Sequence, residues 1–400
     1  MLRVSGLLAT TATGVVLARW LGPERRGELA TLWAWASGLS LLIQCGVPEA
    51  SVVCLGAQEC QVRAQRSVAT IINIGLLLAL LAALATATAL SLVLPVSQSL
   101  AALACLLAAV SLLGTVLRHL LLAVRGTTAF GLSQVIESIT LAVFVAVSAL
   151  VARASVELGI LAYVLSSTLG CIVAGCLVWN RVAPQWSRWL ALDGRTVRDL
   201  CVVGAPLVVI GVASAACQRG TIIVIAETAG NQQAGWYATA TALQSMLLVI
   251  PQQVATVAFA RSAKRVGDEG GTKAILNLRS PLLLGIGLTA LPSILLAVYA
   301  DTVIEAVFGR AFLPSSGSLR VLAISAVVTG VQSIQVGIQL GAGHTRPAVA
   351  SGLVSFVVLA LVLYPACARF GMLGAAWTQV VAAAAGLLAM AVMRRWSYAQ

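Results

Sequence analysis

About a dozen long apolar stretches, separated by short polar breaks, run through the 400 residues of this sequence. A helix needs about 20 apolar residues to cross about 30 Å of hydrocarbon, and the stretches have this length. The composition agrees, because 60% of the residues are hydrophobic, 10% are charged and the mean hydropathy is +0.99. We therefore predict an all-α polytopic membrane protein with about 12 transmembrane helices and no sizeable soluble domain.

The apolar stretches also set the expected helix boundaries. In the first half we expect helices at about 4–19, 29–56, 67–94, 100–124, 134–152 and 158–180. In the second half we expect them at about 201–226, 235–260, 280–300, 317–342, 349–367 and 372–393. The predicted domains are an N-terminal six-helix bundle (1–180), a basic cytoplasmic linker at the membrane interface (181–200) and a C-terminal six-helix bundle (201–400).

An internal repeat relates the two halves. The segment Val16–Gly27 returns in looser form as Val224–Gly235, at a constant offset of 208 residues. Each copy contains Gly-x4-Gly, which we expect to form a short loop between two helices. Parallel repeats of this kind are a common plan for transporters, with the substrate path between the halves. By this offset the first helix looks shortened, so we expect the natural start to lie upstream of Met1.

The distribution of basic residues predicts the orientation, because Lys and Arg in short loops resist translocation. With the N-terminus placed inside, 17 of the 25 basic residues lie in cytoplasmic segments and 7 in outer segments. We therefore expect both termini in the cytoplasm. The net charge of +12 indicates contact with anionic membrane lipids, and the basic residues lack the layout of a nucleic-acid-binding face.

Motifs for catalysis, metals or cofactors are missing from the sequence. Its nine cysteines lack Cys-x2-Cys spacing, and it contains no Walker phosphate loop, no Gly-x-Ser-x-Gly turn and no His-Glu-x2-His motif. We expect no metal, no cofactor and no enzymatic activity.

Charged side chains within the apolar helices are candidates for function, because an ionisable group at membrane depth usually faces a cavity or a partner. Arg219, beside Gln218, lies deep in the seventh expected helix and either faces a substrate or forms a structural pair with a buried carboxylate. Glu49 and Glu137 are candidate ion-coupling groups or partners of a cation. Either could instead lie near a helix end in contact with water.

Amide side chains form a second set of candidates. Gln332, Gln335 and Gln339 follow one another at i, i+3 and i+7, which places them on one helical face. Gln244 in the eighth expected helix adds a further amide. Amides can hydrogen-bond a sugar or hold helices together, and the sequence leaves both alternatives open.

Two motifs and a turn resemble one family. The first motif contains Arg19, Leu21, Gly22, Pro23, Glu24 and Gly27, the second contains Gly230, Gly235, Trp236 and Tyr237, and the turn is Leu340–Arg346. Together they resemble the polysaccharide-transporter branch of the multidrug/oligosaccharidyl-lipid/polysaccharide (MOP) exporter superfamily. The chain departs from that pattern at Thr221, where many relatives carry an acidic residue.

The resemblance implies two six-helix bundles in a V around a central cavity that opens alternately to the two sides of a bacterial inner membrane. It also implies a substrate, an undecaprenyl-pyrophosphate-linked oligosaccharide that is flipped to the outer leaflet for O-antigen, capsule or exopolysaccharide assembly. Glycosyltransferases and a polysaccharide polymerase would be its partners. In this interpretation Arg219 offsets the phosphate charges, the glutamines contact sugar hydroxyls, and Arg118 and Arg125 meet the pyrophosphate first. Arg118 and Arg125 could instead serve only to set the orientation of the protein in the membrane.

Two alternatives remain open from the sequence. A cation-coupled multidrug exporter of the same superfamily would use carboxylates such as Glu49 and Glu137. A membrane scaffold for glycan assembly would transport nothing, and the shortened first helix and Thr221 favour it slightly.

Overall fold

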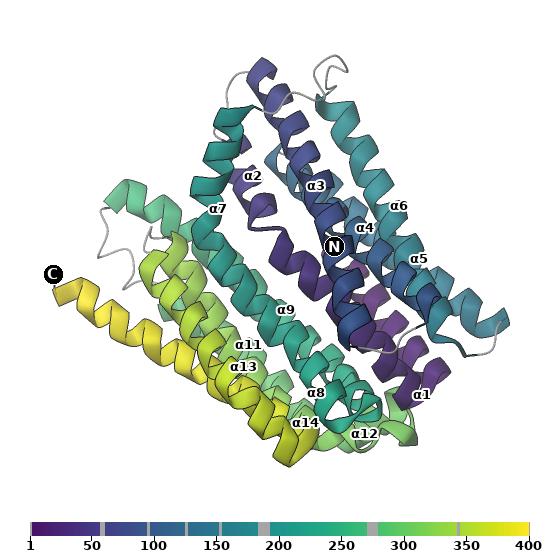
Figure 1. The fold of residues 1–400 in the computed structure, drawn as a ribbon. Coiled ribbons are helices and arrows are strands. Elements are labelled where there is room, and N and C mark those ends of the chain that lie inside the picture. Colours follow the sequence, from purple (N-terminus) through teal and green to yellow (C-terminus); the bar gives the residue numbers. More distant parts are fainter. Residues whose placement is uncertain are drawn as a thin grey trace. The chain divides into compact units, whose positions relative to one another are not determined.

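The computed structural model describes residues 2–56, 61–93, 97–124, 127–151, 154–182, 193–269, 279–341 and 345–399. These residues form helices joined by short turns, and among them there is no strand, which confirms the all-α prediction (Figure 1). Contacts divide the chain into two compact units, Met1–Ala215 (unit 1) and Ala216–Gln400 (unit 2). The predicted repeat domains with a linker at 181–200 stay a prediction, and residues 183–192 of that linker lie outside the described residues.

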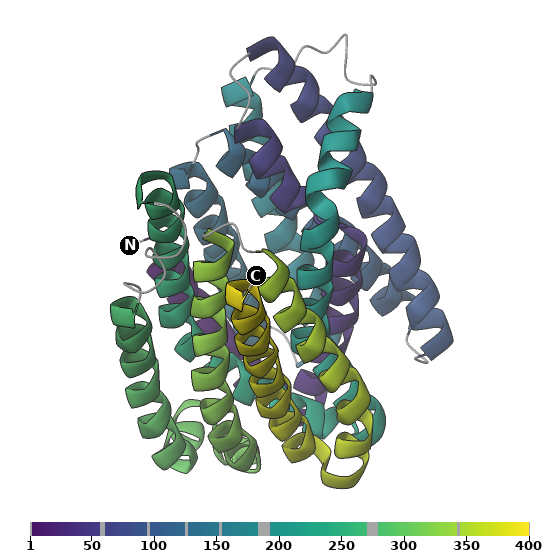
Figure 2. The ribbon, with the colours of Figure 1, turned by 90° about the vertical axis from the view of Figure 1, so that its left-hand side faces the viewer.

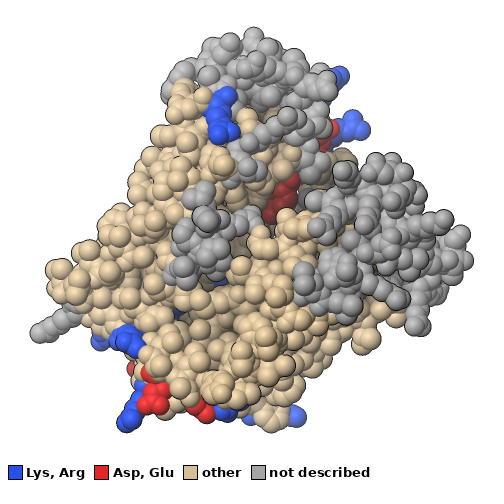
Figure 3. Space-filling model, turned by 180° about the vertical axis from the view of Figure 1, so that it is seen from behind, with Lys and Arg blue, Asp and Glu red and all other residues tan. Residues whose placement is uncertain are grey.

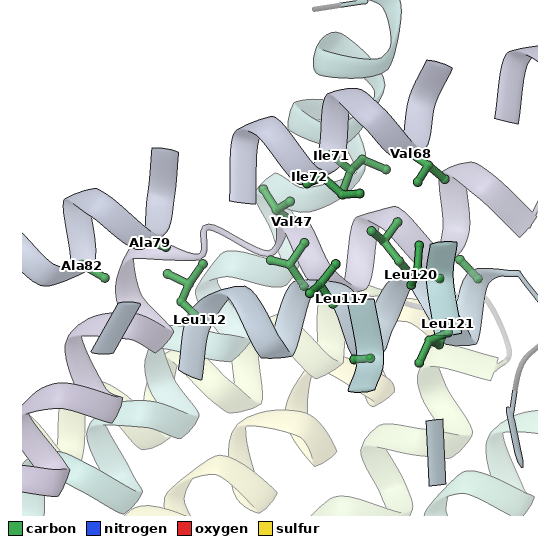
Figure 4. Close-up of a cluster of buried hydrophobic side chains, with 14 of the residues drawn as sticks. Val47, Val68, Ile71, Ile72, Ala79, Ala82, Leu112, Leu117, Leu120 and Leu121 are labelled. Carbon is green, nitrogen blue, oxygen red and sulfur yellow. The ribbon is translucent and has the colours of Figure 1, made fainter. Parts of the chain in front are cut away.

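Unit 1 contains seven of the labelled helices. They are α1 (Leu2–Ile43), α2 (Val47–Gly56), α3 (Gln61–Val93), α4 (Gln98–Ala123), α5 (Thr127–Val151), α6 (Val156–Val182) and α7 (Gly194–Ala215). Helix α4 packs on α1, α2, α3, α5 and α6, so it is the central helix of this unit. Its contact with α3 is a buried apolar cluster that includes Ile71, Ile72, Leu112, Leu117 and Leu120 (Figure 4).

Unit 2 contains the remaining elements, seen from another side in Figure 2. They are the π-helical turn η2 (Ala216–Gly220), α8 (Thr221–Ala229), α9 (Asn231–Glu269), α11 (Arg279–Val298), α12 (Ala300–Val307), the 3-10 turn η3 (Arg310–Phe312), α13 (Ser315–Gly341) and α14 (Thr345–Ala399). Helix α13 packs on α9, α11 and α14.

Seven described helices are long and apolar enough to cross a membrane, or eight if the bent pair of α11 and α12 forms one span. This count takes α14 as one span, although the helix is interrupted at Gly371, where φ is 56°. The outer faces of the helices are strongly apolar, as at Leu77 and Leu80, each 58% exposed. Figure 3 shows that most of the described surface on one face is uncharged. Such a surface suits a lipid solvent.

Backbone conformation confirms the repeat and corrects the expected loop. Gly22 (φ 73°, ψ 175°) and Gly230 (φ 87°, ψ 165°) adopt nearly the same conformation, which only glycine enters readily. The helix resumes at once after each of them, so the predicted Gly-x4-Gly loop was wrong. In the first copy Pro23 explains this, because proline suits the first position of a helix.

Hydrogen bonds repeat at the same offset. Thr31 Oγ1 donates to the Gly27 carbonyl and Thr239 Oγ1 donates to the Gly235 carbonyl, each over 2.9 Å. In each repeat, a side chain just after the first helix break also forms a hydrogen bond with the backbone between the fifth and sixth helices. In unit 1 the Arg25 guanidinium donates to the Ala154 carbonyl. In unit 2 the Gln233 side-chain oxygen accepts from the Met372 amide at 3.1 Å.

The helix expected at 29–56 differs in two ways from the structure. It begins directly after Gly22, and it is interrupted at Gln44–Gly46 before α2 starts. Cys45 (φ 49°) and Gly46 (φ 67°) are both left-handed there. A Cβ added to Gly46 would lie 2.9 Å from the Gly204 carbonyl oxygen of α7, so this break is also a close backbone contact.

Helix α7 packs within unit 1 although its sequence position makes it the start of the second repeat. The Asp193 amide, just before α7, donates to Thr70 Oγ1 of α3 at 3.1 Å. One turn further, the hydroxyls of Ser67 and Thr196 are 3.0 Å apart. These bonds, with the close contact at Gly204, attach α7 to α2 and α3, and the chain enters unit 2 at η2.

Candidate functional site

An enclosed ion pair joins α4 and α5 within the described membrane helices. The Arg118 guanidinium pairs with Glu137 Oε2. Ser167 of α6 donates to the other carboxylate oxygen, Oε1, at 3.0 Å, and Thr115 Oγ1 lies 3.4 Å from Arg118. Two residues that the sequence singled out separately are thus brought together, and three helices contribute to the cluster.

The pair lies deep in the helices. Glu137 is ten residues after the first residue of α5, or about 15 Å along the axis. A Cβ added to Gly114 would lie 3.7 Å from both terminal nitrogens of Arg118, so the guanidinium points back toward the middle of α4. An arginine that only marked orientation would extend to the nearest water instead. Its side chain is 13% exposed and that of Glu137 24%, so the cluster is largely enclosed.

Unit 2 has an uncharged cluster in the same place of its repeat. Gln332 Nε2 of α13 donates to Ser351 Oγ at 3.0 Å and to Ser355 Oγ at 3.1 Å, both from the first part of α14. Ser355 is ten residues into α14, as Glu137 is ten residues into α5. Counted from the first residue of each helix, Gln332 of α13 corresponds to Thr115 of α4. In the same way, Gln335 of α13 corresponds to Arg118 of α4.

A glycine of the sixth helix faces each cluster. A Cβ on Gly170 would lie 3.1 Å from the Glu137 Cβ. A Cβ on Gly386 would collide with Ser355 Oγ and Gln332 Nε2. Both glycines lie fourteen residues after the first helical residue, Val156 in one repeat and Met372 in the other. Each unit therefore contains its own polar cluster at corresponding helix positions. The cluster of unit 1 is a charge pair, and that of unit 2 consists of amide and hydroxyl groups.

Gln218 and Arg219 lie on the π-helical turn η2, and π turns are frequent at functional sites. Gln218 is exposed and Arg219 is half-buried. The adjacent Cys217 carbonyl accepts from Gln379 Nε2 at 3.3 Å. Gln244 Nε2 lies 3.5 Å from Gln379 Oε1, so this amide holds helices together in the structure.

The remaining predicted residues lie elsewhere. Glu49 is exposed in the first turn of α2, Gln335 is half-buried, and Gln339 is buried. Arg125 lies outside the described residues. Among the described side chains, no group of three His, Cys, Asp or Glu could hold a metal ion.

Sequence reasoning missed several members of the clusters. They are Thr115, Ser167, Gly170, Ser351, Ser355, Gln379 and Gly386. Ser351 and Ser355 at i, i+4 give one usable signal, because they place two hydroxyls on one face of an apolar helix.

The second family motif has a structural role. Tyr237 is fully buried, and the Trp236 indole donates to the Ala311 carbonyl at 2.8 Å. The motif residues of both repeats thus lie at the first helix break, where Gly22 and Gly230 adopt the positive φ and the residues that follow pack the break.

Repeated bundles of long apolar helices, each with a polar cluster among its helices, define a multi-pass membrane protein. A family model for polysaccharide biosynthesis proteins matches residues 16–317, and the chain belongs to this family. No curated protein sequence matches the chain.

Solved structures agree on the fold. The inward closed form of the lipid II flippase MurJ is 12% identical, with a TM-score of 0.78 over 98% of this chain and 87% of that one. An inward-facing multidrug resistance MATE transporter of the MOP superfamily is 13% identical, with a TM-score of 0.74 over 97% and 94%. A MOP-superfamily transporter from Pyrococcus furiosus is 15% identical, with a TM-score of 0.64 over 98% and 92%.

Proposed function

We propose that the protein is a flippase that moves a polyprenyl-pyrophosphate-linked oligosaccharide from the cytoplasmic to the outer leaflet by alternating access. The family supplies the link to polysaccharide biosynthesis. A glycan and a pyrophosphate cannot cross hydrocarbon unaided, whereas a polyprenyl tail can stay in lipid. The protein therefore needs to shield only the head of such a substrate, as a transporter and without catalysis.

The observation that carries this proposal is the direction of Arg118. Its guanidinium lies at mid-depth in unit 1, turned away from the nearest helix end. A guanidinium can bind phosphate oxygens through two parallel hydrogen bonds. Arg219 at η2 would supply a second cation, and the exposed Gln218 and half-buried Gln335 would meet the glycan. Arg125 keeps its proposed role as a first contact.

The contacts weaken the multidrug-exporter alternative. Exchange of a cation such as Na⁺ needs a carboxylate that is available to coordinate the ion, but both oxygens of Glu137 are engaged by Arg118 and Ser167. Glu49, which is exposed, keeps that alternative open. We place the protein in the bacterial inner membrane with both termini in the cytoplasm, beside glycosyltransferases and a polymerase.

Reconstitution in liposomes tests the proposal. We expect protein-dependent translocation of a fluorescent polyprenyl-pyrophosphate oligosaccharide, with a large loss of rate in Arg118→Gln and in Arg219→Ala. Arg310→Gln is the matched control, because Arg310 is 87% exposed and pairs only with Glu305 in the described part of the chain. Cation-driven efflux of a dye without lipid translocation would favour the exporter, and no transport of either kind would favour a scaffold.

A further inference from the structure

The ion pair of unit 1 neutralises the cation that the proposed function needs. Glu137 Oε2 pairs with Arg118, and Oε1 accepts from Ser167 at 3.0 Å. A pyrophosphate that approaches Arg118 therefore meets a carboxylate of its own charge. The phosphate can bind only if this carboxylate loses either its place or its charge.

We propose that binding of pyrophosphate at Arg118 is coupled to uptake of one proton by Glu137. The guanidinium exchanges a carboxylate for a phosphate oxygen, and Glu137 takes a proton from water to form a neutral carboxylic acid. One O–H bond of a hydronium ion or buffer acid in the water breaks as one forms on Glu137, so the charge of Arg118 is left to balance part of the charge of the substrate. This inference rests on the proposed function and specifies how its cationic site opens.

Energetics favour protonation over a displaced anion. A carboxylate without its cation, about 15 Å along a membrane helix, would be costly, whereas the neutral acid is not. The pair is enclosed but not sealed, because 13% of the Arg118 side chain and 24% of the Glu137 side chain are exposed.

The surrounding groups can accept the change. A serine hydroxyl both donates and accepts, so Ser167 can rotate to accept from the new acid. Thr115, 3.4 Å from Arg118, stays beside the guanidinium when the carboxylate leaves.

Few other described groups face Glu137 from the helices packed on α5. Helix α4 contributes Arg118, and α6 contributes Ser167 and Cys171, whose Cβ lies beside Gly114 as the Arg118 guanidinium does. Helix α1 reaches the neighbouring Ser138 through the hydroxyl of Thr10, at 3.4 Å. Among these side chains Glu137 is the only carboxyl, so it is the acceptor for the proton.

Unit 2 shows what the same arrangement does without charge. Gln332, Ser351 and Ser355 make hydrogen bonds at the corresponding helix positions and cannot take up a proton near neutral pH. The coupling is therefore a property of unit 1.

Calorimetry with the purified protein tests the coupling. Farnesyl pyrophosphate is titrated in two buffers of different ionisation enthalpy, which yields the number of protons taken up on binding. We expect the unaltered protein to take up about one proton more than Glu137→Gln. The variant should also bind about tenfold more tightly near neutral pH, because its cation no longer has to be released from a partner. Inorganic pyrophosphate in place of the lipid separates recognition of the phosphates from recognition of the chain.

Three variants make the outcome decisive. Arg118→Gln should lose binding, and Glu157→Gln, an acid-to-amide change at the exposed start of α6, should alter neither affinity nor proton uptake. If Glu137→Gln does not fold, Glu137→Asp keeps the acid and should keep the proton uptake. Binding that needs Arg118 but takes up equal numbers of protons with and without Glu137 would overturn the coupling and leave the flippase proposal intact. Absence of pyrophosphate binding together with absence of lipid translocation would overturn both.

Discussion

The side chain of Glu137 crosses α6 directly over Gly170, where an added Cβ would lie 3.1 Å from the Cβ of Glu137. The Cγ and Cδ atoms of Glu137 are each 3.3 Å from that position. Because the carboxylate is held by Arg118 and Ser167, the side chain has little freedom to move aside. Gly170 therefore sets the position of the ion pair.

We expect Gly170→Ala to destabilise the protein by about 1–3 kcal/mol, the usual cost of overpacking. The matched control is Gly175→Ala on the same helix, where the new Cβ would lie 3.7 Å from Leu117, an ordinary contact. Thermal unfolding in detergent measures both. A fall in Tm for Gly170→Ala that is no larger than for Gly175→Ala would show that Glu137 yields without cost.

A double-mutant cycle measures the ion pair itself. Removing one partner of an enclosed pair leaves an uncompensated charge, so Arg118→Gln and Glu137→Gln should each cost up to about 3 kcal/mol. The double variant should lie close to the unaltered protein, because two amides can replace the pair without a net charge. Additive losses in chemical unfolding would contradict this, and Glu157→Gln serves as the exposed control.

Gln332 and Gln335 separate helix attachment from substrate contact in unit 2. Gln332→Leu loses the hydrogen bonds to Ser351 and Ser355 and should cost about 1–2 kcal/mol. Gln335 makes no hydrogen bond to a described residue, so Gln335→Leu should leave Tm nearly unchanged. The pair is compared by thermal unfolding, and equal losses would remove the distinction.

The sequence predicted the class of fold and the relation between the halves because both depend on local patterns. Apolar length predicts membrane helices, and the match of Gly22 with Gly230 predicted equivalent chain breaks. The break at Gln44–Gly46 was missed, although Gly46 with Pro48 two residues later is a local turn signal.

The arrangement of the site could not be predicted, because it depends on how helices face one another. Glu137 was recognised as a charge in an apolar helix and Arg118 as a basic residue near the inner end of its helix, but nothing in one sequence pairs them. Gly170 resembles any glycine of a membrane helix until the Glu137 side chain is seen to cross it. In the same way, the repeat assigns α7 to the second half, while Thr70 and Ser67 attach its start to α3.

Replacing glycine by alanine should have opposite effects at the helix breaks and within a regular helix. Gly22→Ala and Gly230→Ala should each cost about 1–3 kcal/mol, because their conformation is almost restricted to glycine while nothing lies within 4 Å of the added Cβ. Gly14→Ala in α1 also meets nothing within 4 Å but is helical, so it should stabilise by about 0.5–1 kcal/mol. Tm values of the three variants in one detergent test the sign, and a gain at Gly22 or Gly230 would contradict the shared conformation.

The hydrogen bonds at the first turn of α7 predict that the stability of the protein falls in acid. The Thr196 hydroxyl, which donates to Asp193 Oδ2 at 2.8 Å, together with the amides of Arg195 and Thr196, holds the pKa of Asp193 below its usual value against the opposing effect of burial. A lowered pKa means that the contribution to stability is complete above the unfolded value of about 3.9 and is lost as the pH falls through the folded value. Asn also caps helices but does not titrate in this range, so Asp193→Asn is the reference. Relative to Asp193→Asn, the variant Asp193→Ala should be less stable by about 1 kcal/mol at all pH values. The Tm of the unaltered protein relative to Asp193→Asn should be constant from pH 7 to about pH 5 and decline below about pH 4. Parallel curves down to about pH 3 would mean that the Asp193 carboxylate does not stabilise the first turn of α7.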